Sequence, residues 1–301
     1  MLSAKKSDKL RLSLALAAGR LTRRSVGAEA EGCQAATLNG LSYQAASGAG
    51  SVVPQPKGGL PDIAMWGATG NLKQAADINK KLDAAYFWEE DDVATECVNT
   101  LSEKDLAALP YDTRVRLWKA IDAGYVGDVQ KSALDKLDRS VPTIYGKRIS
   151  IKGNLPFRVS TIETLDKLNA LETGKAILAD RGSSDRMVTI EQTADLNGYA
   201  TPLSTGAFLT PEGKPGGGSD SIVHFNPEFG PSEGIPNELV LGHELIHASH
   251  CAKGIIPTTL DKNGTYINEE HQTVGLPPYS EIGLTENSLR VDLGLSKRTK
   301  Y

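Results

Sequence analysis

The sequence predicts an α+β fold: a small antiparallel or mixed sheet packed with one long functional helix, preceded by a small helical region. Two observations support this. Between residues 71 and 139, apolar side chains recur at three- and four-residue spacing, which is typical of helices. After Pro142, short alternating segments that read as strands are interleaved with helical ones. Such an order predicts α+β, and 301 residues suffice for one large or two ordinary domains.

The N-terminal segment differs from the rest. Its first 28 residues carry one acid, Asp8, and seven basic residues: Lys5, Lys6, Lys9, Arg11, Arg20, Arg23 and Arg24. This composition fits a disordered basic tail, a transit peptide or a non-cleaved bacterial export signal, and does not distinguish them. Residues 39–61 are rich in Gly, Ser, Ala and Pro, as linkers are. Residues 1–62 are therefore expected to form a disordered basic tail and linker, with a candidate secretion signal.

Residues 63–141 are expected to form a small helical region of three to five helices. Ser102 and Asp105 have the spacing of a capping box, which marks a helix start. Four aromatic residues of this region are expected to lie in its core rather than in a ligand site: Tyr86, Phe87, Trp88 and Trp118.

Residues 142–301 are expected to form the second domain. Its predicted strands lie at 148–152, 187–190 and 221–225, and residues 194–218 read as a loop rich in Gly and Pro. A helix is expected over 161–171, with Gly174 as its stop. Another helix is expected over 237–251, and two more in the last fifty residues.

Composition excludes several classes of protein. A net charge of −4 argues against a nucleic-acid binder, which needs basic residues to neutralise phosphates. No run approaches 18 apolar residues, so no membrane span is expected. Three scattered cysteines, Cys33, Cys97 and Cys251, argue against a disulfide framework or a thiolate zinc site.

The helix expected over 237–251 carries a His-Glu-x-x-His motif, formed by His243, Glu244 and His247. Residues four apart lie on one face of a helix, so the two imidazoles can bind one zinc ion. Glu244 lies about 100° further round the helix, where it can take a proton from an attacking water without being a ligand. The motif therefore predicts metal-assisted hydrolysis, usually of peptide bonds.

A catalytic zinc of this kind needs a third protein ligand. The residues leave several downstream candidates open: Asp261, Glu269, Glu270, His271, Glu281 and Glu286. His250 is either a group behind the ligands or a solvated histidine at the helix end. His224, on a predicted strand, is expected to pack or to line a substrate cleft rather than to bind metal.

These residues resemble the NleD-type family of type III secreted effector zinc metalloproteases and, more remotely, the light chains of clostridial neurotoxins. The resemblance covers about residues 143–301. The matching segments are His243 to His250, Glu269 to Leu276, Leu284 to Arg290, Leu293 to Leu295, and Arg298 with Tyr301.

The resemblance implies a zincin-like metalloprotease domain of the gluzincin-like type. It implies His243 and His247 as Zn²⁺ ligands and Glu244 as general base. The Glu-Glu-x-x-Thr-x-Gly pattern implies Glu270 as the third ligand, with Glu269 and Glu286 as alternatives. Arg298 and Tyr301 have the Arg-x-x-Tyr spacing of the pair that stabilises the oxyanion. Strand 221–225 is expected to be the edge strand that pairs with substrate.

The expected function is a zinc-dependent endopeptidase, a bacterial effector that is secreted and acts in the host cytoplasm. Its expected partners are a host signalling protein as substrate, with mitogen-activated protein kinases as a family precedent, and a secretion chaperone at the N-terminus. Two alternatives remain: a toxin delivered by another route, as in interbacterial competition, and a non-catalytic effector that binds a host protein. The intact His243, Glu244 and His247 argue against the non-catalytic alternative.

Overall fold

The computed structural model describes residues 71–195, 198–232, 234–258, 267–280 and 283–300. These residues belong to one compact unit, Asp62–Tyr301. The tail and linker expected over residues 1–62 lie outside the described residues, and that expectation stays a prediction. None of the described helices combines the length and the apolar composition that a membrane crossing requires.

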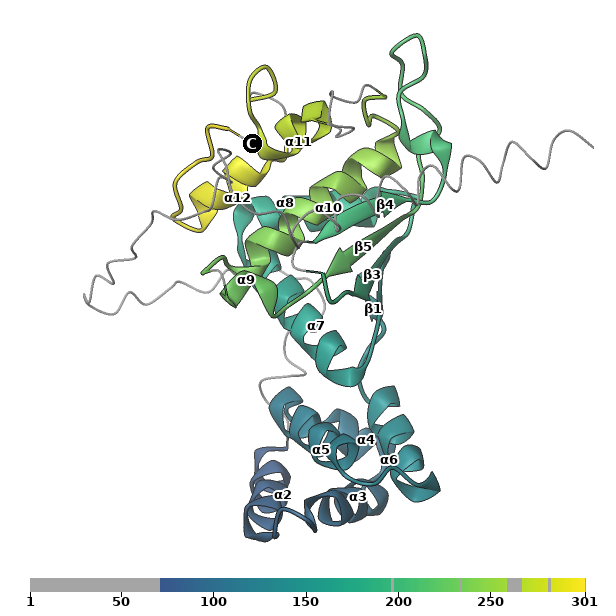
Figure 1. Cartoon of the computed structure of the whole chain (residues 1–301), viewed down its shortest axis with the longest axis vertical. Coiled ribbons are helices and arrows are strands. Elements are labelled where there is room, and N and C mark those ends of the chain that lie inside the picture. Colours follow the sequence, from purple (N-terminus) through teal and green to yellow (C-terminus); the bar gives the residue numbers. More distant parts are fainter. Residues whose placement is uncertain (1–70, 196–197, 233, 259–266, 281–282, 301) are drawn as a thin grey trace, which may run out of the picture. The chain divides into compact units, whose positions relative to one another are not determined.

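Five helices form the first part of the described chain, in agreement with the helical region expected there (Figure 1). They are α2 (Leu72–Ala84), α3 (Glu90–Thr100), α4 (Glu103–Ala107), α5 (Tyr111–Ala123) and α6 (Asp128–Arg139). The predicted capping box is confirmed, because the Ser102 and Asp105 side chains bond reciprocally to each other's backbone N–H. Buried apolar residues of these helices, such as Leu117 and Leu137, belong to the same core as those of the sheet.

The expectation that the aromatic residues of this region lie in the core was wrong for three of the four. Tyr86, Phe87 and Trp88 form the turn between α2 and α3 and are 64%, 83% and 61% exposed. Only Trp118, on α5, packs against the core, and it does so partly buried. The helical period places a residue on a helix face, but these three lie between helices, where that period carries no information.

The sheet has five strands in the order β1-β2-β3-β5-β4. They are β1 (Ile144–Tyr145), β2 (Ile149–Lys152), β3 (Val188–Gln192), β4 (Tyr199–Pro202) and β5 (Ser221–Phe225). The inner pairs β2–β3 and β3–β5 are parallel, and the outer pairs β1–β2 and β4–β5 are antiparallel. The sheet is therefore mixed, and the predicted α+β class is confirmed.

Two expectations about the sheet were wrong. The segment 194–218, expected as a loop, contains β4 and the short 3₁₀ helix η1 (Thr205–Ala207). Strand β5, expected at the edge, lies between β3 and β4, so that β4 is the edge strand beside it. β4 is only four residues long and ends at Pro202, and its Gly- and Pro-rich surroundings hide a strand from pattern analysis.

The helix expected over 161–171 is longer and does not end at Gly174. Helix α7 spans Leu155–Ala170, begins at the side-chain cap of Asn154, and is followed at once by α8 (Glu172–Ser183). Gly174 lies inside α8 and is buried. A Cβ built there would stand 2.0 Å from the backbone oxygen of Leu168 on α7. The glycine therefore serves the close approach of two helices rather than a helix end.

This geometry predicts opposite effects for two glycines of the same helix. Gly174→Ala should lower the free energy of unfolding by a few kcal/mol, because backbone must move to admit the methyl group. Gly182→Ala, where an added Cβ meets nothing within 4 Å, should raise it by about 0.5–1 kcal/mol through helix propensity. Denaturant unfolding of both variants measures the difference, and a stabilised Gly174→Ala would contradict the packing described.

The remaining helices lie after the sheet. They are α9 (Phe229–Ser232), α10 (Asn237–Lys253), α11 (Ile267–Val274) and α12 (Glu286–Asp292), and the predicted helix at 237–251 and the two helices of the last fifty residues are confirmed. Figure 1 shows α10 lying along the sheet, with α11 and α12 beside it. Leu239, Leu245 and Ile246 bury the inner face of α10. This packing fixes the direction in which the motif residues of α10 point.

Candidate active site

Helix α10 brings the two motif histidines together. His243 and His247 lie one turn apart, and their Nε2 atoms are 3.0 Å from each other. Both imidazoles are largely buried, with side chains 14% and 11% exposed. The spacing of the motif on one helix face is sufficient to explain this convergence.

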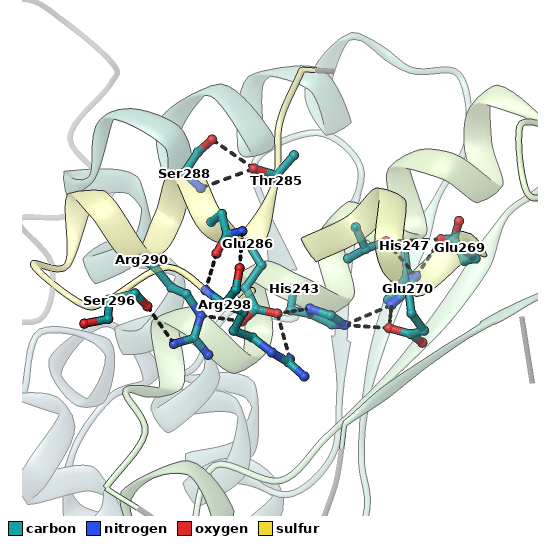
Figure 2. A network of polar contacts seen from close by, with 12 residues as sticks. His243, His247, Glu269, Glu270, Thr285, Glu286, Ser288, Arg290, Ser296 and Arg298 are labelled. Atoms are coloured by element: carbon teal, nitrogen blue, oxygen red, sulfur yellow. Dashed lines mark hydrogen bonds and ion pairs between the residues drawn. The ribbon is translucent and has the colours of Figure 1, made fainter. Parts of the chain in front are cut away.

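Helix α11 adds a carboxylate to the pair. Glu270 Oε2 lies 3.4 Å from Nε2 of His243 and 3.4 Å from Nε2 of His247 (Figure 2). The ligand atoms of these three residues all lie within 4.8 Å of one another, so they could hold one metal ion. Two imidazoles and one carboxylate are a donor set that suits zinc.

Two other carboxylates contact the opposite nitrogens of the same rings. Glu286 Oε2, on α12, is 2.8 Å from His243 Nδ1, and Glu269 Oε1, on α11, is 2.6 Å from His247 Nδ1. Each Nδ1–H therefore donates to a carboxylate, which leaves both Nε2 atoms turned toward Glu270. Carboxylates in this position fix the tautomer and orientation of metal-binding histidines. The structure thus places Glu269 and Glu286 behind the imidazoles, not beside Glu270.

Glu269 is itself held by two further groups. His250 Nδ1 lies 2.9 Å from Glu269 Oε1, and the Thr273 hydroxyl donates to the same oxygen at 3.4 Å. His250 is buried, so it is not a solvated residue at the helix end. No role was predicted for Thr273 from the sequence, although its spacing of four residues from Glu269 places both on one face of α11.

Glu286 is anchored by two arginines. Arg290 Nε donates to Glu286 Oε1 at 2.6 Å, the pairing expected four residues apart on a helix. Arg298 Nη1 donates to Glu286 Oε2 at 3.3 Å, and its backbone forms two hydrogen bonds with the Asn287 side chain. Arg298 therefore reaches the site on the Nδ1 side of His243. Tyr301, its expected partner, lies outside the described residues, as do Asp261 and Glu281.

Within the described ranges, two buried carboxylate oxygens of the site lack the hydrogen bonds that buried acceptors normally accept. Glu270 Oε2 and Glu244 Oε2 are buried and have no hydrogen-bond partner among the described residues. Buried acceptors rarely lack a hydrogen bond, so Glu270 Oε2, which lies 3.4 Å from each of the two Nε2 atoms, and Glu244 Oε2 fit a cation and a water as missing partners. Burial also raises the pKa of Glu244, against the opposing effect of His243 and His247.

The backbone at the end of the sheet approaches the motif glutamate. A Cβ built on Gly198, just before β4, would lie 3.0 Å from Glu244 Cγ. Next to it, Tyr199 stacks on His224 with ring centroids 4.2 Å apart, and burial lowers the pKa of His224. The predicted packing role of His224 agrees with this contact. His271 belongs to neither group of metal-competent side chains found among the described residues.

The metal-free site is expected to hold one proton where a metal would bind. Burial alone would lower the pKa of His243, but the carboxylates of Glu270 and Glu286 raise it to about 9. The pKa of His247 is raised too, yet two Nε2 atoms 3.0 Å apart accommodate one proton, donated by one ring to the other.

Zn²⁺ binding at pH 7 should therefore release about one proton per chain. His243 is protonated below about pH 9 and deprotonated above it. Because this proton competes with zinc, zinc affinity should rise with pH and level off near pH 9. Calorimetric titration in two buffers of different ionisation enthalpy measures the proton. Release of no proton at pH 7 would contradict the shared-proton arrangement.

An α+β fold whose helix carries His-Glu-x-x-His, faced by a carboxylate from a second helix, is typical of metal-dependent peptidases. The chain belongs to the Peptidase M91 family of effector proteins, whose model matches residues 146–301. This range includes α10, α11 and α12, whereas α2–α6 precede it. The predicted effector peptidase family is thereby confirmed, while a similarity to the clostridial light chains stays a prediction.

The chain is also 33% identical over 163 residues to a porphobilinogen deaminase of Shouchella clausii (strain KSM-K16). The match covers 52% of this chain and 49% of that protein, so the chain spans about half the length of the curated relative. No solved structure matches the chain.

Proposed function

We propose that the protein is a zinc-dependent endopeptidase with Glu244 as general base and His243, His247 and Glu270 as ligands. The observation that carries this is the convergence of two Nε2 atoms and Glu270 Oε2 beside the buried Oε2 of Glu244, which has no hydrogen-bond partner among the described residues. When bound, zinc supplies Lewis acidity that polarises the scissile carbonyl and the attacking water. The protein's own residues supply the rest.

In this proposal Glu244 takes a proton from the attacking water and returns it to the leaving amine. Glu269 and Glu286 accept the Nδ1–H bonds of His247 and His243, which keeps both Nε2 lone pairs available. Arg298 and Tyr301 are proposed to stabilise the oxyanion, in line with their spacing. Arg298 can stabilise the oxyanion only if its guanidinium contacts the substrate while it remains paired with Glu286.

The edge of the sheet supports a way of binding an extended substrate. β4 is the edge strand beside β5, and the residue before it, Gly198, is the backbone that approaches Glu244. An extended peptide that pairs with β4 would place its carbonyl groups near that carboxylate. Because β4 rather than β5 is the edge strand, the strand proposed to pair with substrate lies next to the proposed base.

We further propose that the substrate is a protein of the host cell and that the chain is secreted into its cytoplasm. Membership of an effector family supports this. The test compares host cells or lysates exposed to wild type and to Glu244→Gln, with new protein N-termini identified by mass spectrometry. Termini that appear only with wild type would name the substrate. Equal disruption of signalling by both proteins, without new termini, would favour the non-catalytic alternative.

A further inference from the structure

The exposed aromatic residues of the helical region are not explained by the proposed peptidase site. Phe87, Trp88 and Tyr125 are 83%, 61% and 85% exposed. Tyr86 stacks on Trp88 with centroids 5.0 Å apart, and Phe87 meets Trp88 edge-on at 4.7 Å. Most large aromatic side chains are buried, and a cluster left exposed commonly marks an interaction surface. These four residues are called the aromatic turn surface below.

Three residues of the aromatic turn surface, Phe87, Trp88 and Tyr125, line a pocket. Phe87 and Trp88 come from the α2–α3 turn and Tyr125 from the α5–α6 turn, so two separate loops contribute. The pocket between them has a volume of about 720 Å³, and Val115, Ala120 and Ala123 add apolar lining. A concave site with an aromatic rim has the form of a pocket that receives a partner's anchor side chains.

The charged side chains that line this pocket have a small excess of negative charge. Glu90, Asp91 and Asp112 line it, together with Arg116 and Lys119. Arg116 pairs with Asp83 at 2.7 Å and approaches Glu90 at 3.8 Å, so the charges of Arg116 and Glu90 partly offset each other. Of the remaining charges that line the pocket, the two acids Asp91 and Asp112 outnumber the one base, Lys119. The aromatic triplet also lies in a stretch, residues 82–103, that contains seven acids and no Lys or Arg. The acids at the start of α3 favour its helix dipole, but that role does not require exposed aromatic rings beside them.

We propose that the aromatic turn surface is a docking site for a partner protein that presents arginine or lysine side chains next to apolar ones. Carboxylates attract the cations, and the faces of Trp88 and the tyrosines offer cation–π contacts. Apolar neighbours of those cations can fill the pocket between the two turns. The surface lies before the family-matched range, on helices distinct from those of the peptidase site. It therefore gives the peptidase a second, non-catalytic contact with a partner.

The test uses the full chain and a synthetic peptide in which arginine alternates with leucine, labelled for fluorescence anisotropy. We expect this peptide to bind. Peptides with glutamate in place of arginine, or serine in place of leucine, should bind at least about tenfold more weakly, because each lacks one half of the chemistry. Added salt should weaken binding of the arginine–leucine peptide. Equal binding of all three peptides would overturn the proposal.

The decisive variant is Phe87→Ala/Trp88→Ala, which removes rings but no charge. It should weaken peptide binding at least about tenfold while Ile144→Ala, an exposed apolar residue on β1, leaves it unchanged. Thermal unfolding checks that both variants are folded, as we expect because the replaced side chains are exposed. A second variant, Asp91→Asn/Asp112→Asn, should weaken binding through charge alone. Unchanged binding in the ring-deleted variant would mean that only general attraction to an acidic protein is measured.

Two other occupants of the aromatic turn surface would give different results in these binding and sedimentation experiments. If the chain's own basic segment, residues 1–28, covers the surface, replacing its seven basic residues by Gln should tighten peptide binding about tenfold. If a second copy of the chain covers it, Phe87→Ala/Trp88→Ala should convert a dimer to a monomer in sedimentation. Either result would overturn the proposal of a partner protein. Measuring peptide binding on Glu244→Gln as well as on wild type keeps the outcome independent of any peptidase activity.

Discussion

Glu244→Gln is expected to lower the turnover of a protein substrate by about 10²–10⁴-fold while the protein keeps its zinc. The amide has nearly the same size as the carboxylate but cannot accept the proton of the attacking water. Because Glu244 is not among the three converging ligand groups, its replacement removes no metal–protein bond. The change should therefore appear in kcat rather than in metal content.

Metal content by mass spectrometry and turnover per bound zinc measure these two effects separately. Glu238→Gln is a suitable control, since Glu238 lies on the same helix, in its first turn, and should change neither quantity. If Glu244→Gln loses its metal but keeps its rate per bound zinc, Glu244 is a ligand and the assignment of the base is wrong.

Glu270→Ala should cause the second large effect, a loss of zinc binding together with activity. Two imidazoles would remain without the anionic oxygen that completes the set. Glu269→Ala and Glu286→Ala remove carboxylates that contact Nδ1 atoms, so they should retain zinc with an affinity weakened about 10–100-fold. The three variants share one chemical change but remove carboxylates that face different nitrogens of the two imidazoles.

Zinc titration with a competing chelator ranks the three affinities. The expected order places Glu270→Ala far below the other two. Loss of metal in Glu286→Ala, with retention in Glu270→Ala, would instead place the third ligand on α12. The Nδ1 contact of Glu286 would then have to be exchanged for an Nε2-side position, which the structure does not show.

The motif on α10 could be predicted because all of its information is local. The four-residue spacing of His243 and His247 determines that they share a face, whatever surrounds the helix. The selection among Glu269, Glu270 and Glu286 is not local. Consecutive residues on a helix point about 100° apart, and only the docking of α11 on α10 decides which carboxylate meets the Nε2 atoms.

The misread elements have a common physical origin. Gly174 was interpreted as a helix end because glycine commonly terminates helices, whereas here it permits the contact between α7 and α8. β4 was missed because four residues ending in proline give too short a pattern. Tyr86, Phe87 and Trp88 were assigned to the core from their composition alone. In all three cases the observed arrangement depends on other parts of the chain, as in the pairing of β4 with β5, and the local pattern does not contain that information.

The junction between α11 and α12 restricts which substitutions the sequence can accept. Gly275 follows α11 with φ +80°, and a Cβ there would lie 2.9 Å from the side chain of Thr285, the residue that caps α12. The two helices that carry Glu269, Glu270 and Glu286 therefore meet at their ends, where Gly275 lies against Thr285. Position 275 should therefore admit almost no replacement among descendants of this sequence, because a side chain there would face both an unfavourable backbone conformation and Thr285.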